Sequence, residues 1–492
     1  MGSTFSGLNI MTLGMAAQQL SQNTTGHNIA NANTPGYSRQ TVNLITTAPQ
    51  QTNTAYGMSM VGTGVTAASI TRARDFLVDT QYWQQNATQN YWSNQSDSLA
   101  KVENVFNDTK NTGIENAIEQ FQTALATMAG NPSADSTRTA AREAGNALVN
   151  TLQISGNELI TQANNATGRI DAQIKQLNSY STQIAALNKQ IVTQEVGGAM
   201  ANDLRDARDK LVDDLSALAQ VNVTEEKSGA YTVRIAGSIP LVQGDQATTV
   251  TAVHERNVPY GYDTTTFSAV NGTISVNFKN GSLASLTDLR DTTIHGYLNQ
   301  LDAMAQSLMQ DFNAQHKNGL TGDMAKGDNF FGVTGTDYTN SAQYPTNQVP
   351  PCSWISQLQV NPDFYGADGV RKIAAAGASA AGKADGTNAT ALANWLVSAP
   401  TTTSASLGMS SLSSYYSSIV SAVGVQSQQA QNMTTNQTAI LNAVETTRDS
   451  LSGVNMNEEL ANTIKFQQAY GACAKMLTTM NAMFDTLLAM KQ

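Results

Sequence analysis

Both ends of this 492-residue chain carry the pattern of helices. Near the N-terminus apolar residues recur at three- and four-residue steps, and near the C-terminus they repeat every seven residues. Such a repeat predicts a coiled-coil seam, meaning the row of side chains along which two helices pack. A core helix of an ordinary bundle carries the same pattern and remains an alternative. The seam residues are Leu13, Leu20, Phe466, Cys473, Met476, Met480, Met483 and Leu487.

More helices are predicted between the two ends of the chain. Apolar residues at helical spacing mark residues 114–128, 138–191, 204–218, 289–312 and 412–451. The second of these would be one continuous helix of roughly 80 Å. In the third, Arg205/Asp209 and Asp206/Lys210 stand four residues apart, which indicates a solvated helix face.

The hydrophobic period changes to that of strands within residues 221–285. Apolar and polar residues alternate there, with turns expected at Ser228-Gly229 and Asn280-Gly281. The sequence therefore predicts a mainly α fold with a β subdomain: paired terminal coiled-coil helices, a long-helix bundle and a small inserted strand region. The expected domains are a terminal helical domain (1–70 with 440–492), a helical-bundle body (71–220 with 286–439) and a β-rich subdomain (221–285).

Charge is scarce in this chain. Charged residues make up 13% of it, about half the ~25% of an ordinary globular domain, and none precedes Arg39. A segment without charges can be packed inside an assembly without removing ions from water. We therefore expect the ends to be mobile in the single chain and to order against neighbouring subunits, as in a component of a fibre.

The same numbers argue against several other classes of protein. The 27 Lys and Arg against 37 Asp and Glu give a net charge of −10 without a basic cluster, which disfavours nucleic-acid binding. No apolar run is long enough to predict a membrane span. The N-terminus lacks the positive segment and apolar stretch of a cleaved secretory signal. The chain is expected either to stay in the cytoplasm or to leave it by a route that reads no such signal.

Residues that could carry chemistry are few. Cys352 and Cys473 cannot make a disulfide framework or a four-cysteine metal site, and the four histidines are scattered. Residues 377–383 fit the first part of a phosphate-binding loop, but Ala384 stands where a magnesium-binding Ser or Thr is needed. No catalytic residue, cofactor or metal is therefore predicted, and Cys473 is interpreted as a packing residue.

Residues 28–39 (NIANANTPGYSR) resemble the N-terminal signature of bacterial flagellar rod, hook and hook-associated proteins. Residues 202–212, 312–319, 452–462 and 466–470 are similar to segments of the flagellar hook-associated protein 1 family. They follow the order found in that family. The signature residues to which the resemblance assigns an assembly role are Asn28, Ile29, Asn31, Thr34, Gly36, Tyr37 and Arg39.

This resemblance implies a structural protein without enzymatic activity, exported through the flagellar type III apparatus and placed outside the cell between hook and filament. The paired terminal helices would form the inner wall of a tube. The implied partners are the hook protein, hook-associated protein 3, neighbouring copies of the chain and a cytoplasmic export chaperone that binds the C-terminal helix region. The seam residues would serve assembly and chaperone binding, and neither nucleic acid nor membrane would be bound.

The chain departs from some family members that carry a large β domain after the segment matching residues 329–331. Here a short stretch separates Phe331 from Gln359, so an outer domain is expected to be small or missing. Three alternatives remain: another axial protein of hook or rod, which the long helices disfavour; an enzyme carried on the flagellum, for which residues 318–410 offer no catalytic group; and an added adhesion role for residues 221–285.

Overall fold

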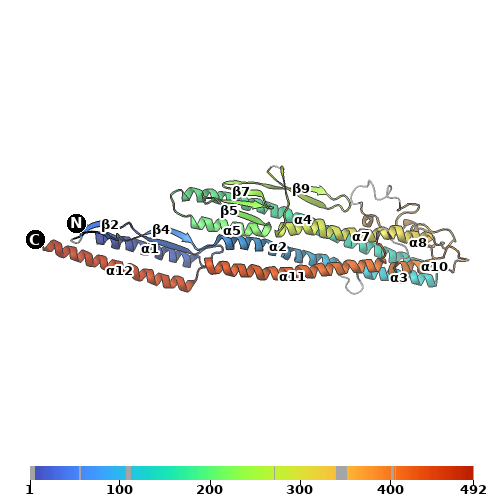
Figure 1. Ribbon diagram of the computed structural model, residues 1–492. Coiled ribbons are helices and arrows are strands. Elements are labelled where there is room, and N and C mark those ends of the chain that lie inside the picture. Colours follow the sequence, from blue (N-terminus) through green and yellow to red (C-terminus); the bar gives the residue numbers. More distant parts are fainter. Residues whose placement is uncertain are drawn as a thin grey trace.

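The computed structural model of this chain is elongated, with both termini at the same end (Figure 1). It describes residues 6–54, 57–106, 112–270, 272–339, 352–380, 382–399, 404 and 406–490. The narrow end, which we call the tail, consists of α1 (Ser6–Asn31), strands β1 to β4 and α12 (Met456–Ala489). All other elements form the body. The predicted mainly α fold with paired terminal helices is confirmed.

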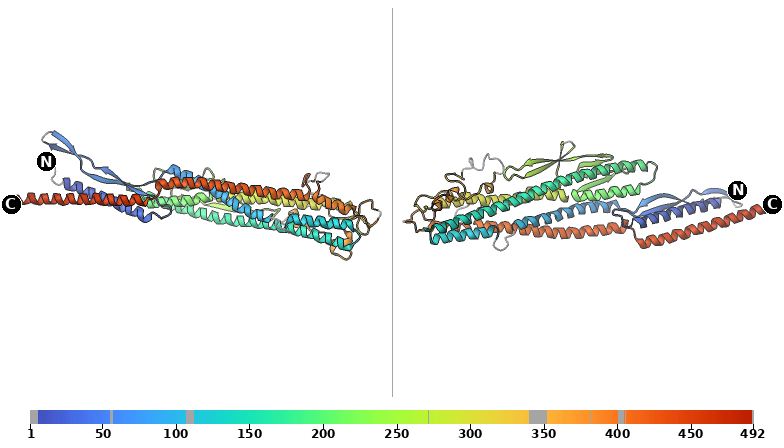
Figure 2. Two further views of the ribbon diagram at one scale, coloured as in Figure 1. Left: turned by 90° about the horizontal axis from the view of Figure 1, so that it is seen from below. Right: turned by 180° about the vertical axis from the view of Figure 1, so that it is seen from behind.

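Strands β1 to β4 follow α1 in the chain and run alongside it (Figure 1). Strands β1 (Gln40–Thr46) and β4 (Val65–Arg72) pair antiparallel, and both contact α1. Strands β2 (Gln50–Thr54) and β3 (Gly57–Val61) form a hairpin of their own. The tail is therefore a helix pair with a narrow β ribbon along one side (Figures 1 and 2).

Long helices run along the body (Figure 2). Their bounds are α2 (Phe76–Val105), α3 (Ile114–Gly130), α4 (Asp135–Glu195), α5 (Asn202–Leu218), α6 (Gly281–Asp288), α7 (His295–Ser307), α8 (Asn313–Lys317), α9 (Trp354–Gln357), α10 (Thr387–Val397) and α11 (Leu412–Ser452). Two π-helical segments, Leu289–Ile294 and Leu308–Phe312, join α6, α7 and α8 into one rod. Short 3₁₀ turns lie at Pro362–Tyr365 and Gly369–Lys372. None of the described helices is both long enough and apolar enough to cross a lipid bilayer.

Helix α4 confirms the predicted continuous helix. It has 61 residues and spans roughly 90 Å at 1.5 Å per residue. Leu148, Leu152 and Ile170 on its apolar side are fully buried, because helical spacing places them on one face against the rest of the body.

The β region packs against α4. Strands β5 (Val221–Glu225), β6 (Tyr231–Ile235), β7 (Ile239–Gln243) and β8 (Gln246–Ala247) form one antiparallel sheet, and β9 (Val250–Arg256), β10 (Asp263–Ala269) and β11 (Ile274–Val276) form another. The turn predicted at Asn280-Gly281 is instead the start of α6. The Asn280 side chain accepts a hydrogen bond from the Gly281 amide as a cap, and Gly281 has a φ of +86°. A Cβ at Gly281 would lie 2.6 Å from the Leu218 carbonyl oxygen, so glycine is required there.

The end of the body opposite the tail has an aromatic core. Phe121, Phe312, Phe330 and Phe331 are fully buried, with ring centroids 4.9–5.9 Å apart. Gly145 of α4 makes room for them, since a Cβ there would lie 2.8 Å from the Phe330 ring. Where the structure describes them, residues 318–410 form loops and short helices around this core.

His316 is buried within these loops and is held as the neutral imidazole. Its Nδ1 lies 2.5 Å from the Asp328 carbonyl oxygen, and its Nε2 accepts from the Ala374 amide at 2.9 Å. One ring nitrogen must therefore donate and the other accept, which the doubly protonated ring cannot do. Burial lowers the pKa of His316 to about 4.

Acidification should therefore destabilise the fold through His316. The folded pKa lies below the ordinary value of 6.5, so the stabilising contribution is present above pH 6.5 and is lost as the pH falls toward 4. We expect a loss of about 2–3 kcal/mol in the free energy of unfolding between pH 6.5 and 4.5. Urea unfolding at both pH values measures it, and His316→Gln should reduce the loss. Equal losses in the two proteins would contradict this assignment.

Candidate functional site: the tail and its joint with the body

The two helices of the tail pack antiparallel along their length. Gly7 lies opposite Met480 and Gly14 opposite Cys473: a Cβ on these glycines would lie 2.7 Å from Met480 Cε and 3.3 Å from Cys473 Sγ. Small residues on α1 thus let α12 approach closely, and Cys473 is a half-buried packing residue of this contact.

The predicted seam is only partly used within the single chain. Phe466, Cys473 and Met480 are half-buried, as are Leu13 and Leu20 of α1. Met476 and Met483 are 50% and 55% exposed. The side chain of Leu487 lies outside the described residues. Of the described side chains of α12, only Glu459 is fully buried, so the tail presents apolar side chains that this chain does not cover.

Among the signature residues, Asn28 has the most internal contacts. It is 1% exposed. Its Nδ2 donates to the Gln40 carbonyl at 2.9 Å and to Glu459 Oε2 at 3.1 Å, and its Oδ1 accepts from the Gln40 amide at 2.9 Å and the Tyr37 hydroxyl at 2.7 Å. One side chain therefore links α1, β1 and α12. Burial and the nearby carboxylate of Asp203 raise the pKa of Tyr37, which keeps its hydroxyl protonated as the donor.

Arg39 and Gly36 complete this arrangement. The Arg39 guanidinium pairs with Glu458 at 3.0 Å and Glu459 at 2.8 Å, and its amide donates to the Ser452 carbonyl at 2.8 Å. Gly36 has a φ of +82°, and a Cβ there would lie 3.1 Å from the side chain of Lys210 on α5. The loop after α1 can therefore lie against the body only with glycine at this position.

The other signature residues lie at the C-terminal end of α1 or in the loop that follows it. Asn31 Nδ2 donates to the His27 carbonyl at 3.0 Å, and the Thr34 hydroxyl donates to Asn31 Oδ1 at 3.2 Å. Ile29 is half-buried. The structure thus brings the signature residues together as contacts within one chain.

A row of alternating charges connects the tail to the body. We call this row the ion-pair chain. Each of its arginines contacts at least two carboxylates, and most of its side chains are at least nine-tenths buried. In order, its members are Asp206, Arg72, Asp209, Arg74, Asp79, Arg448 and Asp213.

The predicted solvated face of residues 204–218 is therefore wrong. Asp206 and Asp209 of α5 are buried and contact Arg72 at the end of β4 at 2.6 and 2.8 Å. Arg205 pairs with Glu195 and Glu225 rather than with Asp209. Burial alone would raise the pKa of Asp209, but the neighbouring arginines outweigh it and lower that pKa. The carboxylate is held charged because its partners Arg72 and Arg74 come from the end of β4 and the residues that follow it, which sequence spacing within α5 does not reveal.

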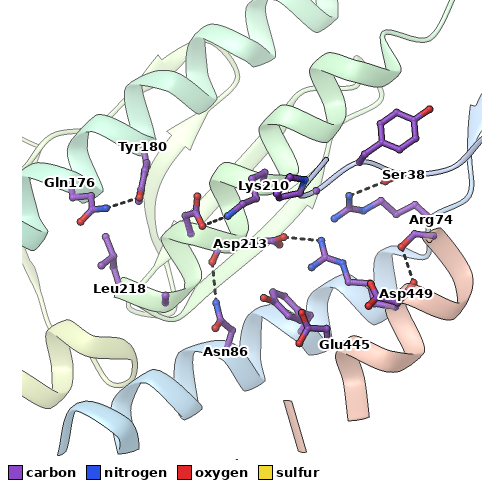
Figure 3. A pocket seen from close by; sticks show the side chains of 18 residues that line it. Ser38, Arg74, Asn86, Gln176, Tyr180, Lys210, Asp213, Leu218, Glu445 and Asp449 are labelled. Atoms are coloured by element: carbon purple, nitrogen blue, oxygen red, sulfur yellow. Dashed lines mark hydrogen bonds and ion pairs between the residues drawn. The ribbon is translucent and has the colours of Figure 1, made fainter. Parts of the chain in front are cut away.

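A cavity lies beside the ion-pair chain (Figure 3). Its volume is about 570 Å³, and it is bounded by the loop at Pro35–Ser38 and by side chains of α2, α4, α5 and α11. Figure 3 shows Arg74, Asp213 and Lys210 close together around it. Glu445 and Asp449 of α11 also line it, so the space is polar and open to water.

Comparison with known proteins accounts for this architecture. Residues 99–331 match the flagellar hook-associated protein FlgK helical domain, residues 8–37 match the flagella basal body rod protein family, and residues 448–490 match the C-terminal segment of the flagellar basal body rod FlgEFG proteins. Flagellar hook-associated protein 1 of Bacillus subtilis is 30% identical over 99% of this chain and 98% of its own length. This chain belongs to the flagellar hook-associated protein 1 (FlgK) family.

Other FlgK proteins are similar over most of this chain. Flagellar hook-associated protein 1 of Escherichia coli is 28% identical over 98% of this chain and 99% of its own length. The flagellar hook junction protein FlgK of Burkholderia pseudomallei superposes with a TM-score of 0.63 at 18% identity, over 76% of this chain and all of that one. The predicted resemblance is confirmed, and the chain is a structural component of the bacterial flagellum.

Proposed function

We propose that this chain builds the junction between hook and filament of a bacterial flagellum. The observation that carries the proposal is end-to-end similarity to hook-associated protein 1 in a chain whose tail presents exposed methionines on α12. Apolar side chains exposed in a row are typical of a contact surface. The described residues hold no cluster of His, Cys, Asp and Glu suited to a metal, and the relatives are flagellar structural proteins.

In this proposal the tails of neighbouring copies form a tube. The tail comprises residues 6–72 and 453–490, since α11 continues past residue 440 to Ser452. The body comprises the helices and the β region between them. An open tube grows only through heterologous contacts, in which one face of a subunit meets a different face of the next. The side of α12 that faces away from α1 would provide one such face.

We further propose how the chain is exported and which proteins it contacts. The chain would leave the cell through the flagellar type III apparatus, with a cytoplasmic chaperone covering the C-terminal helix region, and would then contact the hook protein and hook-associated protein 3. The exposed Met476 and Met483 fit chaperone and subunit alike, because methionine repacks against different partners at little cost.

The tail should exchange its amide hydrogens quickly in the purified monomer. Few of its side chains are buried, so its paired helices gain little stability from packing, and helices with little such support are marginal in water. We expect weak protection in residues 6–38 and 455–490 and strong protection in α4, measured by hydrogen exchange with mass spectrometry. Equal protection in tail and α4 would contradict the idea that assembly orders the tail.

Deletion of the gene tests whether this protein is needed to join the filament to the hook. Cells without this protein should keep their hooks, lose their filaments and release filament subunits into the medium. Electron microscopy and immunoblotting of the medium measure this, and re-expression of the full chain is the control. Hookless cells would instead favour a role in the hook or rod.

A further inference from the structure

The tail meets the body through two short links. Residues Ala73–Asp75 join β4 to α2, and Gly453–Asn455 join α11 to α12, so neither a helix nor a strand continues across the joint. The backbone of Arg39 bonds to both crossings: its amide donates to the Ser452 carbonyl at the end of α11, and its carbonyl accepts from the Ala73 amide in the first link, both at 2.8 Å. Arg39 therefore marks the point at which the tail is fastened to the body.

Each arginine of the ion-pair chain is shared between two carboxylates. Arg72 Nη1 lies 2.6 Å from Asp206 and 2.8 Å from Asp209. Arg74 lies 2.6 Å from Asp79 and 3.4 Å from Asp209. Each of these arginines therefore has a second buried carboxylate close by, which could keep it paired if the first contact lengthened.

Arg448 lies close to the second link and, like both of its carboxylate partners, belongs to the body. It precedes Gly453 by one helical turn and lies 3.0 Å from Asp79 of α2 and 2.9 Å from Asp213 of α5. The three arginines thus come from both crossings between tail and body, and three of the four carboxylates stand on one side of α5. The cavity of about 570 Å³ beside them leaves space into which side chains can move.

We propose that the ion-pair chain is a pivot. The tail changes its angle to the body as arginines shift between neighbouring carboxylates, and the angle is set by which pairs are formed. The guanidinium is suited to this role because its five N–H donors can hold two carboxylates at once, whereas a lysine ammonium is a point charge. This property belongs to the folded monomer and does not depend on the junction role.

Distances between spin labels measure the pivot in the full-length protein. With Cys352→Ser and Cys473→Ser as background, one label pair at Lys465→Cys and Lys189→Cys spans the joint, and another at Lys189→Cys and Asn432→Cys lies within the body. We expect a broad distance distribution across the joint and a narrow one within the body. Arg72→Lys should shift the mean and width of the first and leave the second unchanged.

Two further variants make the test specific. Asp206→Asn removes the outermost carboxylate and should also shift the distribution across the joint. Arg371→Lys changes an exposed arginine paired with Asp135 on α4 and should leave both distributions as in the parent. A distribution across the joint as narrow as that within the body would overturn the proposal. So would a broad one that Arg72→Lys and Asp206→Asn leave unmoved.

Discussion

Replacement of Asp209 by asparagine should lower the free energy of unfolding by about 3–5 kcal/mol, because it removes a buried carboxylate whose negative charge two buried arginines share. Asp209 is fully buried and contacts Arg72 at 2.8 Å and Arg74 at 3.4 Å. Asparagine has nearly the same shape but no charge, so both arginines would lose a counter-ion that water cannot replace. Urea unfolding of the full chain at pH 7 measures the effect.

Asp214→Asn is the matched control on the same helix. Asp214 is 36% exposed and pairs with Lys210, which is also exposed. Exposed pairs contribute about 0–1 kcal/mol, so the control should stay within about 1 kcal/mol of the parent. Losses of equal size in the two variants would show that Asp209 is not distinguished by its burial.

The contrast between these two aspartates also shows what the sequence could predict. Helices α4, α11 and α12 were predictable because their apolar residues keep a helical period over many turns. The burial of Asp209 was not predictable. Charged residues spaced four apart on a helix give the same sequence pattern whether they face water or the arginines of another segment. Its partners Arg72 and Arg74 lie more than a hundred positions earlier in the chain.

A signal for this site was nonetheless present. Residues 203–214 carry a dense run of charges in a chain with 13% charged residues, and charge that is so unevenly spread favours a specific role over general solvation. The signature at residues 28–39 was recognised from resemblance alone. That Asn28 makes four hydrogen bonds within one chain could not be read from spacing, because Gln40 and Glu459 are joined to it only by the fold.

The seam shows a second thing that the sequence could not predict. A heptad repeat predicts that all of its positions pack, but it does not say against which molecule. Phe466, Cys473 and Met480 are half-buried in the single chain, whereas Met476 and Met483 leave half or more of their surface exposed. The repeat is thus consistent with two sets of contacts, one to α1 and one to a partner outside the chain.

Charging this uncovered side should abolish filament attachment. In a Met476→Glu and Met483→Glu double variant the helix, its length and its contacts with α1 are retained. Burial of a methionine contributes about 1.5–3 kcal/mol, so losing two at one interface costs about 3 kcal/mol or more, a factor above about a hundred in affinity. The monomer should be unaffected within about 0.5 kcal/mol, since both side chains are exposed.

The measurement is complementation of the deletion strain, scored by filaments per cell and by filament subunits released into the medium. The matched control is Ile154→Glu with Val425→Glu, which places two charges on apolar side chains of the body that are 69% and 67% exposed. Detection of the double variant in the medium separates failed assembly from failed export. Filaments at parental numbers with both tail methionines charged would mean that the exposed side of α12 meets no partner in the flagellum.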